Sequence, residues 1–85
     1  VKASGVAKSF DKSIAGTYTV TASSGLNVRD AAGTGNKVLV SIPKGTSVKN
    51  YGYYTEVGGV KWLYVQFTYK GITYTGFCSA AYLKK

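Results

Sequence analysis

The chain has 85 residues and a formal net charge of +8 at pH 7, with 45% hydrophobic, 14% aromatic and 16% charged residues. A chain of this length supports one hydrophobic core, and its low charge content and many aromatic side chains exclude an intrinsically disordered protein. The single cysteine, Cys78, excludes an intrachain disulfide framework, and no apolar run approaches the ~18 residues that a membrane helix needs.

Residues 1–15 are rich in Ala, Ser, Gly and Lys and poor in large apolar side chains. Val6, Phe10 and Ile14 have a helix-like spacing, but so little apolar surface makes an isolated helix marginal. We therefore expect residues 1–15 to be a linker or an N-terminal extension that leans on the domain, and residues 16–85 to be the domain itself. Since the chain contains no Met, we expect a fragment or a processed product of a longer protein.

From residue 16 onward, short runs of β-branched and aromatic residues alternate with turn-forming residues, as is typical of strands. The predicted strands are 17–22, 26–29, 37–42, 47–54, 61–69 and 73–78, and a closing turn is predicted at 80–83. Gly58-Gly59 and Lys70-Gly71 separate neighbouring strands and predict two β-hairpins. This arrangement favours a small all-β barrel or sandwich.

Alternation along the strands divides their side chains between two faces. In 26–29, the leucine and the valine are expected in the core, whereas Asn27 and Arg29 face outward. In 61–69, the apolar residues at 63, 65 and 67 are expected in the core, and Trp62 and Tyr64 are expected outward as a stacking platform. The alternative for these two rings is partial burial under the N-terminal segment.

Short motifs occur in a definite order along the predicted strands. They are Leu26-Asn27-Val28-Arg29, Pro43-Lys44-Gly45-Thr46, Trp62-Leu63-Tyr64-Val65, Gly76-Phe77-Cys78 and Tyr82-Leu83. In order and spacing they resemble the bacterial SH3 (SH3b) family. The resemblance implies an SH3-like barrel of roughly five to seven short antiparallel strands. Compared with the family pattern, Asp30-Ala31-Ala32-Gly33 replaces a Ser-Gly-Pro loop and Cys78 replaces a valine.

The resemblance also implies a function. Domains of this family bind peptidoglycan and are often attached to the C-terminal side of a catalytic domain in phage endolysins and autolysins. It thus implies a non-catalytic module that tethers a bacteriolytic enzyme to the Gram-positive cell wall. The implied partners are the stem peptide, crossbridge or glycan of the wall and an N-terminal catalytic domain of the parent protein. We expect a monomer without cofactor, metal or membrane partner.

The residues that catalysis commonly requires are scarce. The chain has no histidine, and its three acids, Asp11, Asp30 and Glu56, are far apart in sequence. Cys78 therefore has no imidazole to activate it, and no Cys/His cluster has the spacing of a metal site. We expect Cys78 to be a small buried hydrophobe and any catalysis to lie elsewhere in the parent protein.

The outward polar and aromatic side chains are the candidate ligand contacts. Tyr and Trp rings contact sugars or peptides at low entropic cost, an amide matches a peptide group, and Arg binds a carboxylate. The predicted binding residues are Asn27, Arg29, Asp30, Tyr51, Tyr53, Trp62 and Tyr64. Asp30 would receive a free amino group, and a bulge at Gly52 would turn Tyr51 and Tyr53 outward. The plainer alternatives are that Asn27 satisfies a loop and that Arg29 pairs with Asp30.

Two other functions fit the composition. A basic barrel with exposed aromatic rings can bind single-stranded nucleic acid, and a groove on a small barrel can dock extended or proline-rich peptides. The Lys and Arg residues are scattered along the chain, whereas nucleic-acid backbones usually require denser positive charge. The same charge suits an anionic cell wall or simply keeps the domain soluble.

Overall fold

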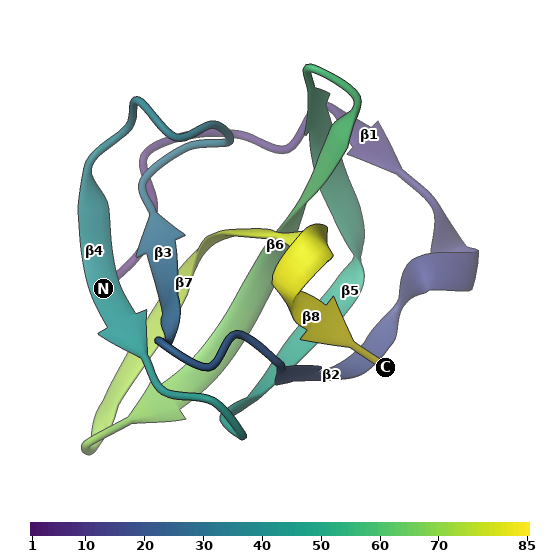
Figure 1. The fold of residues 1–85 in the computed structure, drawn as a ribbon. Helices are drawn as coiled ribbons and strands as arrows, with labels where there is room; N and C mark the ends of the chain where they lie inside the picture. Colours follow the sequence, from purple (N-terminus) through teal and green to yellow (C-terminus); the bar gives the residue numbers. More distant parts are fainter.

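Short strands joined by tight turns make up most of the computed structural model, which describes all residues from Val1 to Lys85 (Figure 1). The strands are β1 (Ser9–Phe10), β2 (Gly16–Val20), β3 (Leu26–Arg29), β4 (Val38–Ile42), β5 (Ser47–Val57), β6 (Val60–Tyr69), β7 (Ile72–Ser79) and β8 (Leu83–Lys84). Two 3-10 turns, η1 (Lys12–Ile14) and η2 (Ala80–Tyr82), complete the chain. The predicted all-β class is confirmed, and each predicted strand is present with its ends shifted by a few residues.

The strands form one curled sheet in the order β4-β3-β7-β6-β5-β2-β8, with β1 paired to β5. Neighbouring strands are antiparallel, as in the SH3-like barrel that was predicted. The two predicted hairpins are confirmed, since β5 turns into β6 at Gly58-Gly59 and β6 into β7 at Lys70-Gly71. All four of these turn residues have positive φ, which is the geometry of the type I′ turn.

The interior of the barrel is filled by apolar side chains from most of the strands. They are Val20, Leu26, Val28, Ile42, Val48, Leu63, Val65, Phe67 and Cys78. The alternation predicted for β3 and β6 therefore holds for their apolar residues. Cys78 is fully buried, as predicted, and burial raises the pKa of its thiol to about 12.

A bulge in β5 decides where its tyrosines point. The register of β5 on β6 shifts just after Asn50, and Gly52 has a φ of +104°, which glycine adopts without strain. The buried Asn50 side chain holds this bulge: its Nδ2 donates to the carbonyls of Tyr53 and Tyr64, each at 2.9 Å, and its Oδ1 accepts from the Gly52 amide at 2.8 Å. The predicted bulge is confirmed, and Tyr51 and Tyr53 are about half exposed.

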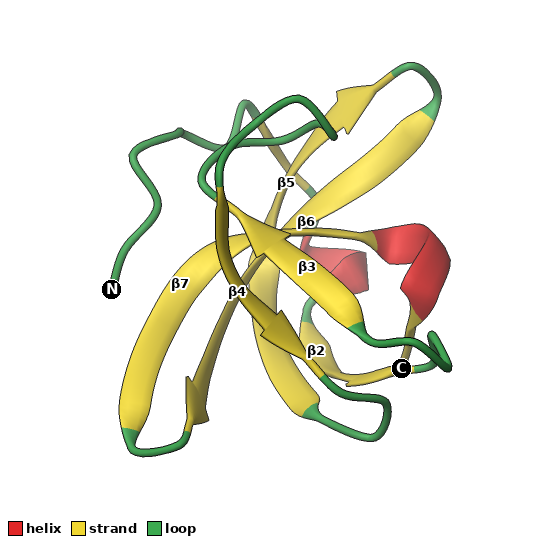
Figure 2. Ribbon diagram, turned by 60° about the vertical axis from the view of Figure 1, so that its left-hand side comes forward, coloured by secondary structure: helices red, strands yellow, loops and turns green.

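Residues 1–15 lie on the barrel (Figure 2). Lys2 forms a parallel bridge with Thr75 of β7, Ala3 is buried, and β1 pairs with β5. The helix-like spacing of the apolar residues in this segment does not produce an α-helix: Phe10 lies in β1, Ile14 lies in η1, and Val6 lies in neither. The segment thus leans on the domain in the structure, while the boundary at residue 16 stays a prediction.

Gly76 of β7 allows β3 to approach closely. A Cβ at this position would lie 2.6 Å from Val28 Cγ1 and 3.0 Å from the Arg29 carbonyl oxygen. We expect Gly76→Ala to lower the free energy of unfolding by about 1–3 kcal/mol, because overpacking must displace a buried side chain and a strand. Gly35→Ala is the control, since a Cβ there meets nothing within 4 Å. If the two variants unfolded at the same urea concentration, the close approach of β3 to Gly76 would be contradicted.

Burial of Cys78 leads to a prediction about its thiol. With a folded-state pKa of about 12, the native thiol should stay unreactive toward a disulfide reagent at pH 8 and react only after unfolding in urea. Because the unfolded thiol ionises first, Cys78 should lower stability as pH rises from its ordinary pKa toward about 12. This part of the decrease in stability at alkaline pH should be absent in Cys78→Val. If the thiol of the native protein reacted as fast as that of the unfolded protein, the burial of Cys78 would be refuted.

Candidate ligand-binding site

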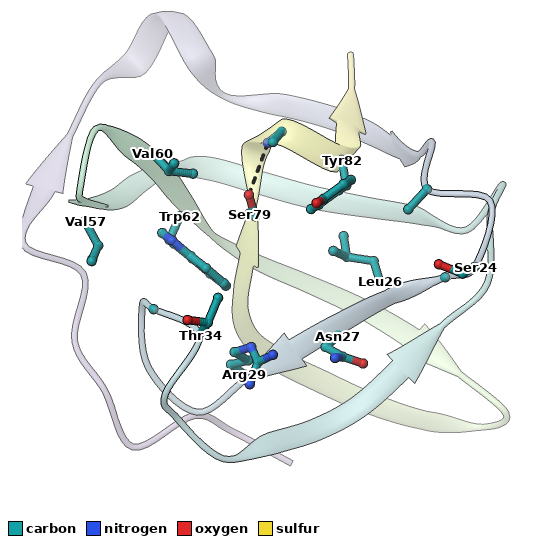
Figure 3. Close-up of a pocket in the computed structure, with 14 residues that line it drawn as sticks. Ser24, Leu26, Asn27, Arg29, Thr34, Val57, Val60, Trp62, Ser79 and Tyr82 are labelled. Atoms are coloured by element: carbon teal, nitrogen blue, oxygen red, sulfur yellow. Dashed lines mark hydrogen bonds between the residues drawn. The ribbon is translucent and has the colours of Figure 1, made fainter.

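The largest hollow of the surface lies beside β3, and we call it the indole hollow (Figure 3). It has a volume of about 570 Å³. Asn27 and Arg29 reach it from β3, Trp62 from β6 and Tyr82 from η2, while the tip of the β5–β6 hairpin forms another wall through Val57. Residues from four separate parts of the chain therefore meet at one place.

The indole hollow combines a held cation with apolar walls. Arg29 is half-buried, and its Nη1 donates to the Asn36 carbonyl oxygen at 2.9 Å, which fixes the guanidinium and leaves its other N–H groups for a ligand. Val57 and Tyr82 remain 43% and 50% exposed. Exposed apolar groups around a positioned charge are typical of a ligand site. The arrangement suits a ligand that carries a carboxylate next to small apolar groups.

Trp62 contributes to the hollow in a different way from the one predicted. The ring was expected outward as a platform with Tyr64, but it is only 6% exposed and packs with Ala3 and Phe77. The N-terminal segment covers this side of the sheet, so the alternative of burial under that segment describes Trp62. Tyr64 is half-buried, with its ring centroid 4.8 Å from that of Phe77.

A second concave surface, which we call the tyrosine groove, lies between residues 2–7 of the N-terminal segment and the strands β5 and β6. It consists of two hollows of about 490 and 330 Å³ that share Lys2, Tyr53 and Tyr64. Tyr51 lines the smaller hollow, and the Lys49 ammonium lies 5.2 Å from the centre of the Tyr51 ring. Exposed phenol rings and ammonium groups alternate here, a combination that can contact sugars or peptides.

Asp30 does not have the free carboxylate that was expected. Its Oδ1 accepts from the Ser4 amide at 2.8 Å, and its Oδ2 accepts from the Ser4 hydroxyl. These two hydrogen bonds, the hydroxyl's first, lower the pKa of Asp30. The alternative pairing of Arg29 with Asp30 is also not what the structure shows, because the Arg29 guanidinium turns to the Asn36 carbonyl instead.

The predicted binding residues are thus distributed over two surfaces. Asn27, Arg29 and Trp62 line the indole hollow; Tyr51, Tyr53 and Tyr64 line the tyrosine groove; Asp30 lines neither. Asn27 accepts a hydrogen bond from the Ser41 hydroxyl on β4 rather than satisfying a loop. Whether any of these residues binds a ligand stays a prediction.

Sequence reasoning missed several walls of the indole hollow. Tyr82 was not among the predicted binding residues, yet it is half exposed at the rim, and Val57 and Val60 were not considered. A signal was present in the sequence, because these two valines flank Gly58-Gly59 at a hairpin tip. Apolar residues at such a tip lie beyond the reach of a small core and therefore face either solvent or a ligand.

Two further structural findings concern metals and membranes. No cluster of three or more His, Cys, Asp or Glu side chains is placed to hold a metal ion. None of the helical turns has the length and apolarity to cross a bilayer.

The burial of Trp62 changes the expected effect of mutating it. Trp62→Ala should lower the free energy of unfolding by about 3–5 kcal/mol, because it empties a core site. Tyr51→Ala, at a half-exposed ring, should change it by no more than about 0.5 kcal/mol. Thermal unfolding followed by circular dichroism measures both. A Trp62→Ala chain as stable as Tyr51→Ala would show that the indole is a surface group after all.

Comparison with protein-family models matches residues 24–84 to the bacterial SH3 domain, SH3_3. The matched region runs from the turn before β3 to β8 and includes Asn27, Arg29, Trp62 and Tyr82 of the indole hollow. No curated protein and no solved structure matches the chain. Because the family model covers most of the sequence and the strands curl into a half-barrel consistent with the SH3-like fold, the chain belongs to the bacterial SH3 domain family, whose members are generally non-catalytic binding domains.

Proposed function

We propose that this domain binds peptidoglycan of the bacterial cell wall through the indole hollow. The observation that carries the proposal is the meeting of a held guanidinium, an amide and exposed apolar side chains in one hollow of about 570 Å³. These groups come from Asn27 and Arg29, which belong to the LNVR motif, and from the hairpin and turn that face them. The family to which the chain belongs supports a binding role over a catalytic one.

The chemistry of the hollow favours a short peptide as the part of the wall that is bound. Stem peptides of peptidoglycan carry carboxylates beside small aliphatic side chains. A carboxylate can take a bidentate hydrogen bond from Arg29. The small aliphatic groups would then contact Val57 and Tyr82, which are the exposed apolar walls. Asn27 offers an amide for the peptide backbone.

The overall charge supports attraction to an anionic surface. The formal net charge is +8, and two of the three acids are occupied within the domain, Asp11 by Ser13 and Asp30 by Ser4. Positive charge on the surface raises the encounter rate with wall polyanions without fixing which group is recognised. Specificity is therefore assigned to the hollow and the general attraction to the lysines.

In the parent protein, we propose that the domain holds a wall-lytic catalytic domain against its substrate, as in a phage endolysin or an autolysin of Gram-positive bacteria. Binding without chemistry concentrates an attached enzyme at the wall by raising its effective concentration.

The test is a pull-down of the 85-residue chain on purified Gram-positive sacculi at several salt concentrations. Arg29→Gln should weaken binding at high salt about tenfold or more, since a lost charged hydrogen bond is worth about 1.5–3 kcal/mol. Lys44→Gln is the matched control, because it removes the same charge from an exposed turn. It should weaken only the electrostatic part of the binding, which is seen at low salt and is screened at high salt.

Three outcomes are informative in this experiment. No binding of the unmodified chain at moderate salt would overturn the proposal. If Arg29→Gln and Lys44→Gln weakened binding equally, the binding would be due to charge alone and the indole hollow would not be the binding site. Because Arg29 also donates to Asn36, the melting temperature of each variant is measured alongside, and the comparison uses proteins that are fully folded at the assay temperature.

A further inference from the structure

The outer edge of β7 is bridged by the extended start of the chain. The Thr75 amide donates to the Val1 carbonyl at 2.8 Å, and the Ala3 amide donates to the Thr75 carbonyl at 2.7 Å. The bridge between Lys2 and Thr75 is parallel, unlike the antiparallel pairs of the sheet. In the chain's own fold, then, this edge already accepts an extended peptide.

The edge is open because β3 covers only a small part of β7. The two strands pair at Arg29 and Phe77, so the first half of β7, which contains Thr75, has no neighbouring strand of the barrel on that side. An uncovered edge presents unpaired N–H and C=O groups and is a template for a further strand. The N-terminal segment uses these groups.

The surface under this segment selects small side chains. Ala3, Gly5 and Ala7 point inward at alternate positions, whereas Ser4 and Val6 are exposed. Ala3 is buried against Trp62 and Phe77. A Cβ on Gly5 would lie 2.8 Å from the Ala31 Cβ, closer than packed atoms approach one another.

The segment is attached mainly through its backbone. Beyond β7, the Gly5 amide donates to the Asp30 carbonyl at 2.9 Å, and Ser4 bonds the Asp30 carboxylate. Its inward side chains are Ala and Gly, which themselves bury little apolar area, but opening would expose Trp62 and Phe77. A peptide that displaces the segment must therefore cover the same two rings. Recognition by backbone hydrogen bonds and pockets for alternate side chains is the mode called β-augmentation.

We propose that the outer edge of β7, with Trp62 and Phe77 as its floor, is a second binding site, and that it takes an extended peptide with Ala or Gly at alternate positions. Residues 1–7 occupy this site in the free domain, and a peptide of the same character displaces them. The site shares Trp62 with the indole hollow but none of the groups to which ligand recognition is assigned there, Asn27, Arg29, Val57 and Tyr82, and it does not depend on wall binding. The parallel register and the small inward residues of the resident segment define its ligand.

The experiment uses the full chain with two substitutions, Ala3→Arg and Gly5→Leu, that expel the segment. In this double variant the Thr75 amide should exchange with solvent at least about tenfold faster, since its acceptor on Val1 is withdrawn. The emission of Trp62, the only tryptophan, should shift to longer wavelength. Adding the acetylated peptide Val-Lys-Ala-Ser-Gly-Val-Ala in trans should restore both signals in a saturable way.

Matched controls separate the site from general effects of charge and bulk. Val6→Arg adds the same charge at a position that is 79% exposed, and Gly35→Leu adds the same bulk where nothing lies within 4 Å. Both variants should keep Thr75 protected and the Trp62 emission unchanged. A peptide in which leucine replaces the glycine should not restore the double variant.

Two results would overturn the proposal. Unchanged Thr75 exchange and Trp62 emission in the double variant would show that the segment does not occupy the edge. An expelled segment with no rescue by the trans peptide at about 1 mM, a concentration at which even weak peptide ligands register, would show a fixed cover and not a binding site. Fast amide exchange at Leu63 and Val65 in the double variant would mean that the whole domain has unfolded. In that case the single variant Gly5→Leu is tested with the same peptide. Unchanged Thr75 exchange and Trp62 emission, or no rescue by the peptide, would then overturn the proposal.

Discussion

The short seam between β3 and β7 is the constraint on which the indole hollow and the open edge of β7 depend. The two strands pair at Arg29 and Phe77, and they approach this closely because residue 76 is glycine. The seam brings Arg29 of β3 to the side of the barrel where the buried ring of Trp62 of β6 lines the indole hollow. Because it is so short, it also leaves the first half of β7 uncovered. One local contact therefore produces the indole hollow and the open strand edge together.

The N-terminal segment that covers the edge of β7 also adds to the core of this small domain. A chain of 85 residues has few large apolar groups with which to stabilise its fold. The N-terminal segment covers Trp62 and Phe77 and so extends the core beyond the main barrel. The contact is made by small residues and backbone hydrogen bonds, so the segment covers the rings of Trp62 and Phe77 while its own side chains bury little apolar area. Stability and access to a ligand are thus adjusted by the same segment.

Asn50 shows how a buried polar group directs an exposed surface. Its amide is nearly inaccessible, and all of its recorded hydrogen bonds go to backbone groups around the β5 bulge. A buried amide that is bonded in this way specifies one backbone conformation, because any other leaves polar atoms unpaired. The consequence is that Tyr51 and Tyr53 both face the tyrosine groove, although alternation along a regular strand and the packing of Tyr54 would not guarantee it.

Local patterns in the sequence were sufficient to predict the fold class, the two hairpins, the bulge at Gly52 and the burial of the apolar residues of β3 and β6. Each of these depends on neighbouring residues: glycines that adopt positive φ, β-branched runs, and the period-two alternation that a pleated strand imposes. The burial of Cys78 was also predictable from its apolar neighbours. The match of residues 24–84 to the bacterial SH3 domain agrees with motifs visible in the same stretch.

Only the tertiary structure decided which outward residues are free to act. Trp62 has the alternation of a surface residue, yet Ala3 packs on it, and Asp30 has the carboxylate of a ligand contact, yet Ser4 bonds to it. Both outcomes depend on contacts between residues distant in the chain, which no local period or propensity encodes. Likewise, Tyr82 and Val57 become walls of a hollow only because the curl of the sheet brings η2 and the β5–β6 hairpin to β3. Strand periodicity determines which side of a sheet a residue faces, whereas the path of the rest of the chain determines what lies against that side.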